Sequence, residues 1–150
     1  RLFSVVQTID SLDLARRLDR IVREELGLPA SGSAGAAERL SVLVQVNVDR
    51  DPGKAGFEPD AVGRVLPALL ELGALRIAGL MTIGLFGGAP EAARPTFRRL
   101  RALADGLRAE HPSLGSELSM GMTDDYPVAV EEGATIVRVG RALFGERPGA

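Results

Sequence analysis

The chain has 150 residues, of which 45% are hydrophobic and 25% charged, and its 18 basic and 20 acidic residues leave a formal net charge of -2. This composition is that of an ordinary globular protein, and the length favours a single domain over residues 1–150. Basic residues are nowhere clustered with aromatic ones, so the sequence does not indicate nucleic-acid binding. With no cysteine and a single histidine, His111, the chain can form no disulfide and gives no indication of a metal site.

The sequence also lacks membrane signals. No segment approaches the roughly 18 consecutive apolar residues that a membrane-spanning helix needs, and residues 1–7 are too few and too polar at their flanks for a signal peptide. We therefore expect a cytoplasmic protein with no membrane partner. Because residue 1 is not methionine and lies in a strand-like run, we also expect the gene product to begin further upstream.

Strand-like and helix-like segments alternate along the chain. Strands are predicted where short apolar runs are rich in β-branched residues, and helices where apolar residues recur every three to four positions. In chain order the predicted segments are a strand at 2–6, a helix at 12–26, a strand at 42–46, a helix at 62–70, a strand at 77–81, a helix at 91–110, a strand at 117–120, a helix at 126–132, a strand at 135–139 and a last helix from Arg141.

Residues suited to helix ends flank these predicted helices. A side-chain oxygen at the N-cap accepts a hydrogen bond from a free backbone N–H, and glycine readily adopts the left-handed conformation that ends many helices. The predicted N-caps are Asp10 or Ser11, Asp60 and Asp124, and the predicted C-terminal glycines are Gly27, Gly73 and Gly133.

The alternation of apolar strands with amphipathic helices predicts an α/β fold with a parallel sheet, because parallel neighbours need crossover connections. Residues 29–37 interrupt this pattern with a run of alanine, glycine and serine. We interpret this run as a flexible surface insertion within one domain, since the helix before it and the strand after it must stay close together.

In a parallel α/β protein the functional groups gather where strands end. The predicted strand ends carry Gln7, Asn47, Met81 and Thr82, then the segments 119–125 and 138–141. The last two segments hold glycines and hydroxyls close to helix starts, which favours a bound phosphate. The same glycines and hydroxyls could equally be turn residues and helix caps, so the pattern alone leaves both interpretations open.

The last two segments also resemble a known family. The run LSMGMTDD at 118–125, followed by GATIVRVG at 133–140 and FG at 144–145, closely resembles the pyridoxal phosphate homeostasis proteins. Upstream, TIDS at 8–11, VQVN at 44–47, KAG at 54–56 and GLMTI at 79–83 follow in the family's order. The resemblance covers the chain except for the alanine, glycine and serine insertion.

The resemblance implies an alanine racemase N-terminal-domain-like fold, a (β/α)8 TIM barrel of which this chain would form about the last five strands. It implies pyridoxal 5'-phosphate (PLP) as cofactor, with the phosphate held by Ser119, Gly121 and Thr123 and by the backbone of Gly140. Arg138 would face the pyridine nitrogen. Met81 and Asn47, at earlier strand ends, complete the cofactor-binding residues that we predict.

In this family the lysine that forms the Schiff base lies on the first barrel strand. This chain resembles the family only from the fourth strand onward, so the resemblance does not include that lysine. Lys54 is the only lysine of this chain and lies in a loop. We interpret it as a solvated loop residue rather than as a point of PLP attachment. Thr123 stands where the family more usually has serine, which keeps a hydroxyl at this position.

The resemblance therefore predicts a protein that binds PLP or other B6 vitamers and acts as a carrier or regulator without robust catalysis. An arginine at the pyridine nitrogen makes the cofactor a poor electron sink, which disfavours carbanion chemistry. The alternatives are an amino-acid racemase of similar fold and a scaffold fragment with a vestigial phosphate site. Because five strands cannot close an eight-stranded barrel, we also expect self-association through the open edges.

Overall fold

The computed structural model describes residues 3–29, 33–35, 37–84 and 89–145. In these residues strands and helices alternate as the sequence predicts. The elements are β1 (Val5–Ile9), α1 (Leu12–Leu26), β2 (Leu40–Gln45), α2 (Pro59–Leu70), β3 (Leu75–Met81), the 3-10 helix η1 (Pro90–Ala93), α3 (Arg94–Glu110), β4 (Glu117–Met122), α4 (Tyr126–Glu131), β5 (Ile136–Arg138) and α5 (Arg141–Phe144).

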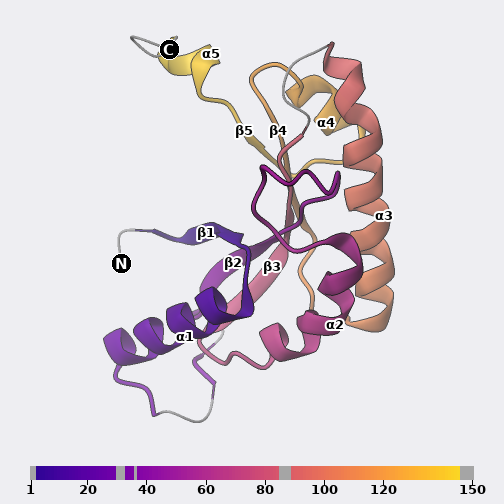
Figure 1. The fold of residues 1–150 in the computed structure, drawn as a ribbon. Helices are drawn as coiled ribbons and strands as arrows, with labels where there is room; N and C mark the ends of the chain where they lie inside the picture. Colours follow the sequence, from indigo (N-terminus) through magenta and orange to yellow (C-terminus); the bar gives the residue numbers. More distant parts are fainter. Residues whose placement is uncertain (1–2, 30–32, 36, 85–88, 146–150) are drawn as a thin grey trace.

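The five strands form one parallel sheet in sequence order, β1-β2-β3-β4-β5. Figure 1 shows the sheet curled, with α1, α2, α3 and α4 on its outer face and the other face open. This is half of a barrel, and it confirms the predicted α/β fold. All strands point the same way, so their carboxyl ends meet at one rim.

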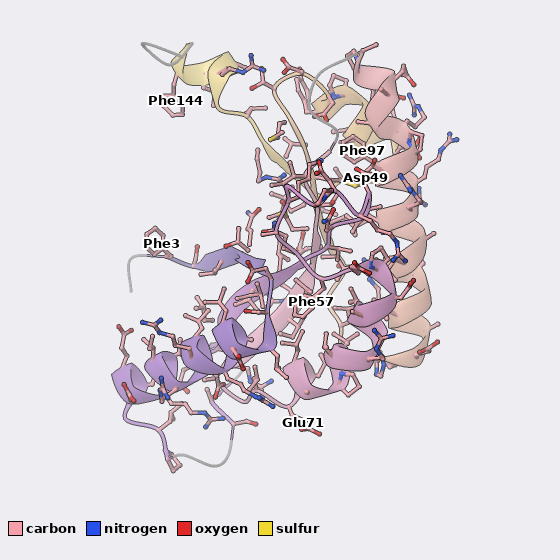
Figure 2. The ribbon with its side chains drawn as sticks, viewed as in Figure 1. Phe3, Asp49, Phe57, Glu71, Phe97 and Phe144 are labelled. Carbon is pink, nitrogen blue, oxygen red and sulfur yellow. The ribbon has the colours of Figure 1, made fainter. Side chains whose placement is uncertain are left out.

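The main core lies between the sheet and the helices. Val42 and Val44 of β2 are fully buried on this side together with Phe97 of α3, and Figure 2 shows Phe97 between its helix and the sheet. Leu43, between the two valines, belongs instead to a smaller cluster on the concave face with Ala78 and Met81. The two clusters show that both faces of the central strands are apolar, as expected for a parallel sheet.

The first strand differs from its prediction. The apolar run at 2–6 predicted its limits, but β1 runs from Val5 to Ile9 and Phe3 is 69% exposed. The sheet extends over the polar Gln7 and Thr8 because Ile9 reaches the core, where it is fully buried. Pairing of Ile9 with Val44 then fixes the end of the strand.

Helix ends were predicted with mixed success. Ser11 caps α1 by accepting a bond from the N–H of Leu14, and Gly27 ends this helix at a φ of 63°. Gly133, with a φ of 94°, follows α4 as predicted. The other three predictions were wrong. Helix α2 starts at a proline one residue before Asp60, and α4 is preceded by Asp125 and not by Asp124. Helix α2 also ends before Gly73, without a residue in the left-handed conformation.

The alanine, glycine and serine run contacts the body of the molecule at Ala34, and the Pro29 carbonyl at its start accepts a bond from Arg23 of α1 at 3.1 Å. Residues 30–32 and 36 of the predicted insertion lie outside the described residues. Ala34 is buried, and its N–H donates to the carbonyl of Gly73 at 3.0 Å.

Within the described part of the chain, no helix combines the length and the apolar character that crossing a membrane requires.

Candidate functional site at the carboxyl ends of the strands

A chain of hydrogen bonds crosses the concave face of the sheet near its carboxyl rim. Arg138, at the end of β5, donates to the hydroxyl of Ser119 at 2.8 Å and to the carbonyl of Thr82 at 2.9 Å. The Ser119 hydroxyl in turn donates to Oε1 of Gln7 at 2.7 Å. Gln7 lies on β1 and Ser119 on β4, so the curl of the sheet brings non-adjacent strands together at this place.

Arg138 carries a charge without an acidic partner at this position. Its acceptors are a hydroxyl and a carbonyl, and no carboxylate of the described residues lies within ion-pair distance of it. Burial lowers the pKa of Arg138 because it disfavours the charged form, and the negative charge of Asp125 opposes this effect. A half-buried cation with spare N–H donors and no counter-charge favours a ligand that presents an acceptor atom or an anion.

The turn between β4 and α4 lies next to this arginine. Gly121 has a φ of 88°, and a Cβ placed on it would stand 2.5 Å from the Cβ of Ala129. Only glycine therefore lets α4 approach β4 so closely. Asp125 closes the turn by accepting a bond from the N–H of Met122 at 2.6 Å, and its own N–H donates to the Met122 carbonyl.

The same turn contacts the start of α5. The hydroxyl of Thr123 accepts a bond from the N–H of Ala142 at 3.4 Å, and Asp124 forms an ion pair with Arg141. Gly140 stands at this junction, where a Cβ would meet nothing within 4 Å. Three of the four residues predicted at the phosphate, Gly121, Thr123 and Gly140, are therefore close together.

Ser119 and Met81 occupy a different part of the site. Ser119 lies on β4 before the turn that contains Thr123, is fully buried, and contacts Arg138 through its hydroxyl. Met81 is 2% exposed in the apolar cluster of the concave face. The structure thus separates a polar and apolar floor, formed by Ser119, Arg138 and Met81, from a rim of glycines and hydroxyls.

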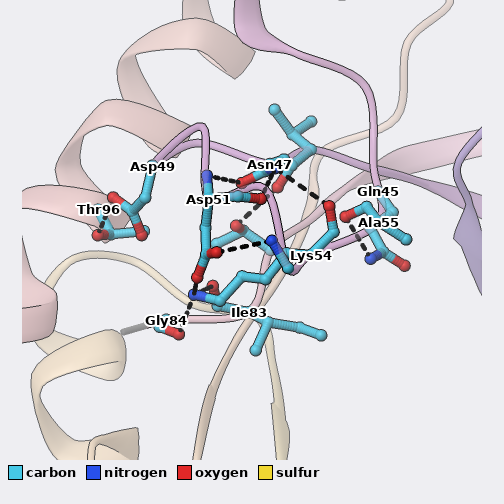
Figure 3. Close-up of polar contacts among 12 residues, drawn as sticks. Gln45, Asn47, Asp49, Asp51, Lys54, Ala55, Ile83, Gly84 and Thr96 are labelled. Atoms are coloured by element: carbon cyan, nitrogen blue, oxygen red, sulfur yellow. Dashed lines mark hydrogen bonds and ion pairs between the residues drawn. The ribbon is translucent and has the colours of Figure 1, made fainter. Parts of the chain in front are cut away.

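Asn47 organises the loop that follows β2, as Figure 3 shows. Its Nδ2 donates to the carbonyls of Asp51 at 2.8 Å and Lys54 at 3.2 Å, while its Oδ1 accepts from the N–H of Asp51 at 3.0 Å. Both amide hydrogens are used within the loop, so Asn47 would have to exchange one of these bonds in order to contact a ligand.

Lys54 is not the solvated loop residue that its sequence position predicts. Its side chain is only 12% exposed. Its ammonium donates to the carbonyls of Gly84 at 2.8 Å and Ile83 at 3.4 Å, and lies 3.8 Å from Oδ2 of Asp51 (Figure 3). The prediction was wrong because the acceptors belong to the segment after β3, about thirty positions along the chain, which sequence proximity does not reveal.

Gln7 and Thr82 lie at predicted strand ends but are not among the predicted site residues. Their contacts with Ser119 and Arg138 make them part of it. The signal that could have found them is the polar residue at the carboxyl end of an otherwise apolar strand, which in a parallel sheet points to the functional rim.

The chain belongs to the alanine racemase N-terminal domain family, whose model matches residues 2–148. Among curated proteins it is 48% identical over 106 residues to the pyridoxal phosphate homeostasis protein of Aquifex aeolicus, covering 71% of this chain and 46% of that protein. It is 36% identical over 145 residues to the protein of the same name from Synechocystis sp., covering 97% and 62%. The chain thus spans about half to three-fifths of the length of these relatives.

Solved structures support the same assignment. PipY of Synechococcus elongatus PCC7942 matches without PLP at a TM-score of 0.81 and 40% identity, covering 95% of this chain and 62% of that one. PipY with PLP bound matches at a TM-score of 0.78 and 39% identity, covering 95% and 61%. Alanine racemase of Clostridium difficile matches at a TM-score of 0.65 and 18% identity, covering 95% and 34%, which shows a shared fold alone.

Proposed function

We propose that this chain forms the PLP-binding half of a pyridoxal phosphate homeostasis protein, which carries or regulates PLP and does not turn over an amino acid efficiently. The observation that carries the proposal is the half-buried Arg138, whose charge has no acidic partner among the described residues. Relatives that are named for PLP homeostasis, and a similar structure described with PLP bound, support the choice of ligand.

In this proposal the two parts of the site contact the two ends of the ligand. Arg138, oriented by Ser119 and Thr82, donates to the pyridine nitrogen. The turn with Gly121 and Thr123, together with the backbone of Gly140, surrounds the phosphate. Met81 contributes an apolar contact, and Asn47 shapes the neighbouring loop.

Bound PLP supplies an electron-withdrawing ring, and its strength as an electron sink depends on protonation of the pyridine nitrogen. Arginine remains protonated at all ordinary pH values and can only donate hydrogen bonds. A nitrogen that accepts a bond from Arg138 therefore stays unprotonated, and the ring stays a weak sink. This favours a carrier or regulator over a racemase.

The direct test is ligand-dependent stability of the chain. Pyridoxine 5'-phosphate is a suitable probe because it has the ring and the phosphate but no aldehyde. At about one hundred times its Kd it should raise the free energy of unfolding by about 2.7 kcal/mol. Pyridoxine without phosphate should have a much smaller effect. If neither compound nor inorganic phosphate changes the thermal unfolding of the chain, the site is vestigial and the proposal is wrong.

A cytoplasmic location and self-association through the sheet edges remain parts of the same proposal. The exposed edges are available for pairing because β1 and β5 each have one neighbour in the described sheet. Other B6 vitamers that carry a phosphate would be ligands by the same contacts.

A further inference from the structure

Lys54 joins two loops at the rim that are far apart in sequence. It lies between β2 and α2, and its ammonium binds the carbonyls of Ile83 and Gly84 directly after β3 (Figure 3). We propose that Lys54 is a positioning residue of the ring site, which holds residues 82–84 in place and through them the orientation of Arg138. This inference rests on the proposed function, since it assigns a role within that site.

The route from Lys54 to Arg138 runs through Thr82. The Thr82 N–H donates to the Ser119 carbonyl at 3.0 Å, and its hydroxyl donates to the Val46 carbonyl at 2.8 Å. The Thr82 carbonyl is one of the two acceptors of Arg138. Beyond Thr82, Lys54 supplies the side-chain bonds that hold the next two carbonyls. Without its ammonium, residues 83 and 84 would lose these bonds, and the Thr82 carbonyl, which lies in the peptide unit between Thr82 and Ile83, would be restrained from the Thr82 side alone.

Lys54 is itself held in place by its own loop. Its N–H donates to the Asp51 carbonyl at 3.0 Å, and its carbonyl accepts from Asn47. The next residue, Ala55, accepts a bond from the Gln45 side chain at 2.8 Å. The stem of the lysine therefore starts from a fixed backbone, so little conformational freedom is lost when the ammonium binds its two carbonyls.

This geometry also bears on the chemistry of the only lysine of the chain. An amine condenses with an aldehyde, releasing water, only when it is unprotonated and its lone pair is free. The Lys54 ammonium donates to the carbonyls of Ile83 and Gly84, and its nitrogen would have to leave both in order to reach an aldehyde. The two hydrogen bonds that join the rim loops therefore also disfavour reaction of Lys54 with PLP.

The test compares the wild-type chain with Lys54→Met, which keeps the length of the side chain but removes the donor. We expect the affinity for pyridoxine 5'-phosphate to fall about tenfold. We also expect the absorption spectrum of the bound ligand to show pyridine protonation at higher pH than in wild type, because Arg138 is less well placed. Lys54→Arg, which can still donate to two carbonyls, should recover most of the affinity and the wild-type spectrum.

Arg50→Gln is the matched control. Arg50 lies in the same loop and forms exposed ion pairs with Glu58 and Asp60, but it does not contact residues 82–84. It should bind the probe as wild type does. Circular dichroism verifies that each variant is folded. If Lys54→Met does not fold, Lys54→Gln takes its place, with the same expected loss.

The outcomes separate this inference from the proposed function. Failure of the wild-type chain to bind pyridoxine 5'-phosphate would contradict the proposed function and with it this inference. Wild-type binding together with unchanged affinity and spectrum in the lysine variants would overturn this inference alone. Reduction with borohydride in the presence of PLP, followed by peptide mapping, should leave Lys54 unmodified in wild type. A reduced PLP adduct on Lys54 would also overturn it.

Discussion

At the scale of one residue, the unfavourable environment of Arg138 is what supports its proposed role in ligand binding. Burial lowers its pKa, yet the Ser119 hydroxyl and the Thr82 carbonyl that accept its hydrogen bonds are both neutral. A structural arginine would more often be paired with a carboxylate, as Arg23 is with Asp19 at 2.6 Å. Burying the Arg138 charge without a carboxylate costs free energy when no ligand is bound, so folding alone does not account for this residue.

The substitution Arg138→Met should therefore separate binding from stability. We expect affinity for pyridoxine 5'-phosphate to fall tenfold or more, about 1.4 kcal/mol. The free energy of unfolding should change by no more than about 1 kcal/mol, since the lost hydrogen bonds are offset by relief of desolvation. Calorimetric titration and urea unfolding measure the two quantities.

Arg76→Met is the control for that experiment. Arg76 also donates to a serine hydroxyl, that of Ser41 at 2.8 Å, but at the opposite end of the strands and exposed to solvent. It should leave ligand binding unchanged. Equal losses of affinity in both variants would contradict the role assigned to Arg138.

The second prediction at the scale of one residue concerns Gly121. Its φ of 88° opposes a side chain, and so does the 2.5 Å separation that an added Cβ would have from the Ala129 Cβ. Gly121→Ala should destabilise the chain by about 1–3 kcal/mol in urea unfolding. Gly106→Ala, on α3 with nothing within 4 Å of its Cβ position, should instead stabilise it by up to about 1 kcal/mol. An unaffected Gly121→Ala variant would show that α4 can move away from β4 at little cost.

At the scale of elements, ion pairs fix the loops and short helices that surround the rim. Asp49, in the loop after β2, accepts bonds from Thr96 and Arg99 of α3 at 2.7 Å and 2.6 Å. Arg94, at the start of α3, contacts Glu131 and Glu132 around the end of α4 at 2.7 Å and 2.6 Å. These contacts hold the loop and α4 against α3, and α4 in turn packs on Gly121.

The contact with Glu132 predicts a pH dependence of stability. A hydrogen bond from Arg94 holds the pKa of Glu132 below its usual range, with desolvation opposing this effect. As the pH falls, Glu132 therefore takes up a proton in the unfolded chain before it does so in the folded chain. The stabilisation by the contact between Arg94 and Glu132 is complete above the ordinary glutamate pKa of about 4.3, and it is lost as the pH falls through the folded-state pKa.

We expect the free energy of unfolding of wild type to fall more steeply below about pH 5 than that of Glu132→Gln. Urea unfolding at a series of pH values measures both slopes. Glu24→Gln, at an exposed position on α1 with no ion pair in the described residues, should keep the wild-type slope. Parallel curves for wild type and Glu132→Gln would contradict the proposed coupling between α3 and α4.

At the scale of the whole molecule, the half-barrel leaves apolar groups exposed at both edges of the sheet. Phe3, before β1, is 69% exposed, and Leu143 and Phe144, after β5, are 70% and 87% exposed. Figure 2 shows Phe3 and Phe144 on the open side of the molecule, away from α2 and α3. Unpaired parallel edges with neighbouring aromatic side chains favour association with another chain.

We therefore expect the 150-residue chain to self-associate at micromolar concentration. Size-exclusion chromatography with light scattering should give a mass above that of one chain, and the double substitution of Phe3 and Phe144 by serine should lower it. A compact monomer for the unsubstituted chain would contradict this prediction.

The sequence by itself determined the order and type of the elements. The apolar spacing of residues 12–26 matches α1 residue for residue, and Ser11 and Gly27 mark its ends, because helix periodicity and capping depend on near neighbours in sequence. The glycines and hydroxyls of the rim were likewise visible in the motifs that carry the family resemblance.

Only the tertiary structure decided which of these residues meet. The contact between Gln7 and Ser119 joins residues 112 positions apart across the concave face, and it depends on how strongly the sheet curls. The burial of Lys54 likewise depends on the path of the segment after β3. Curvature and loop paths arise from packing over the whole sheet, so local sequence patterns predict the strand ends but not the contacts made between them.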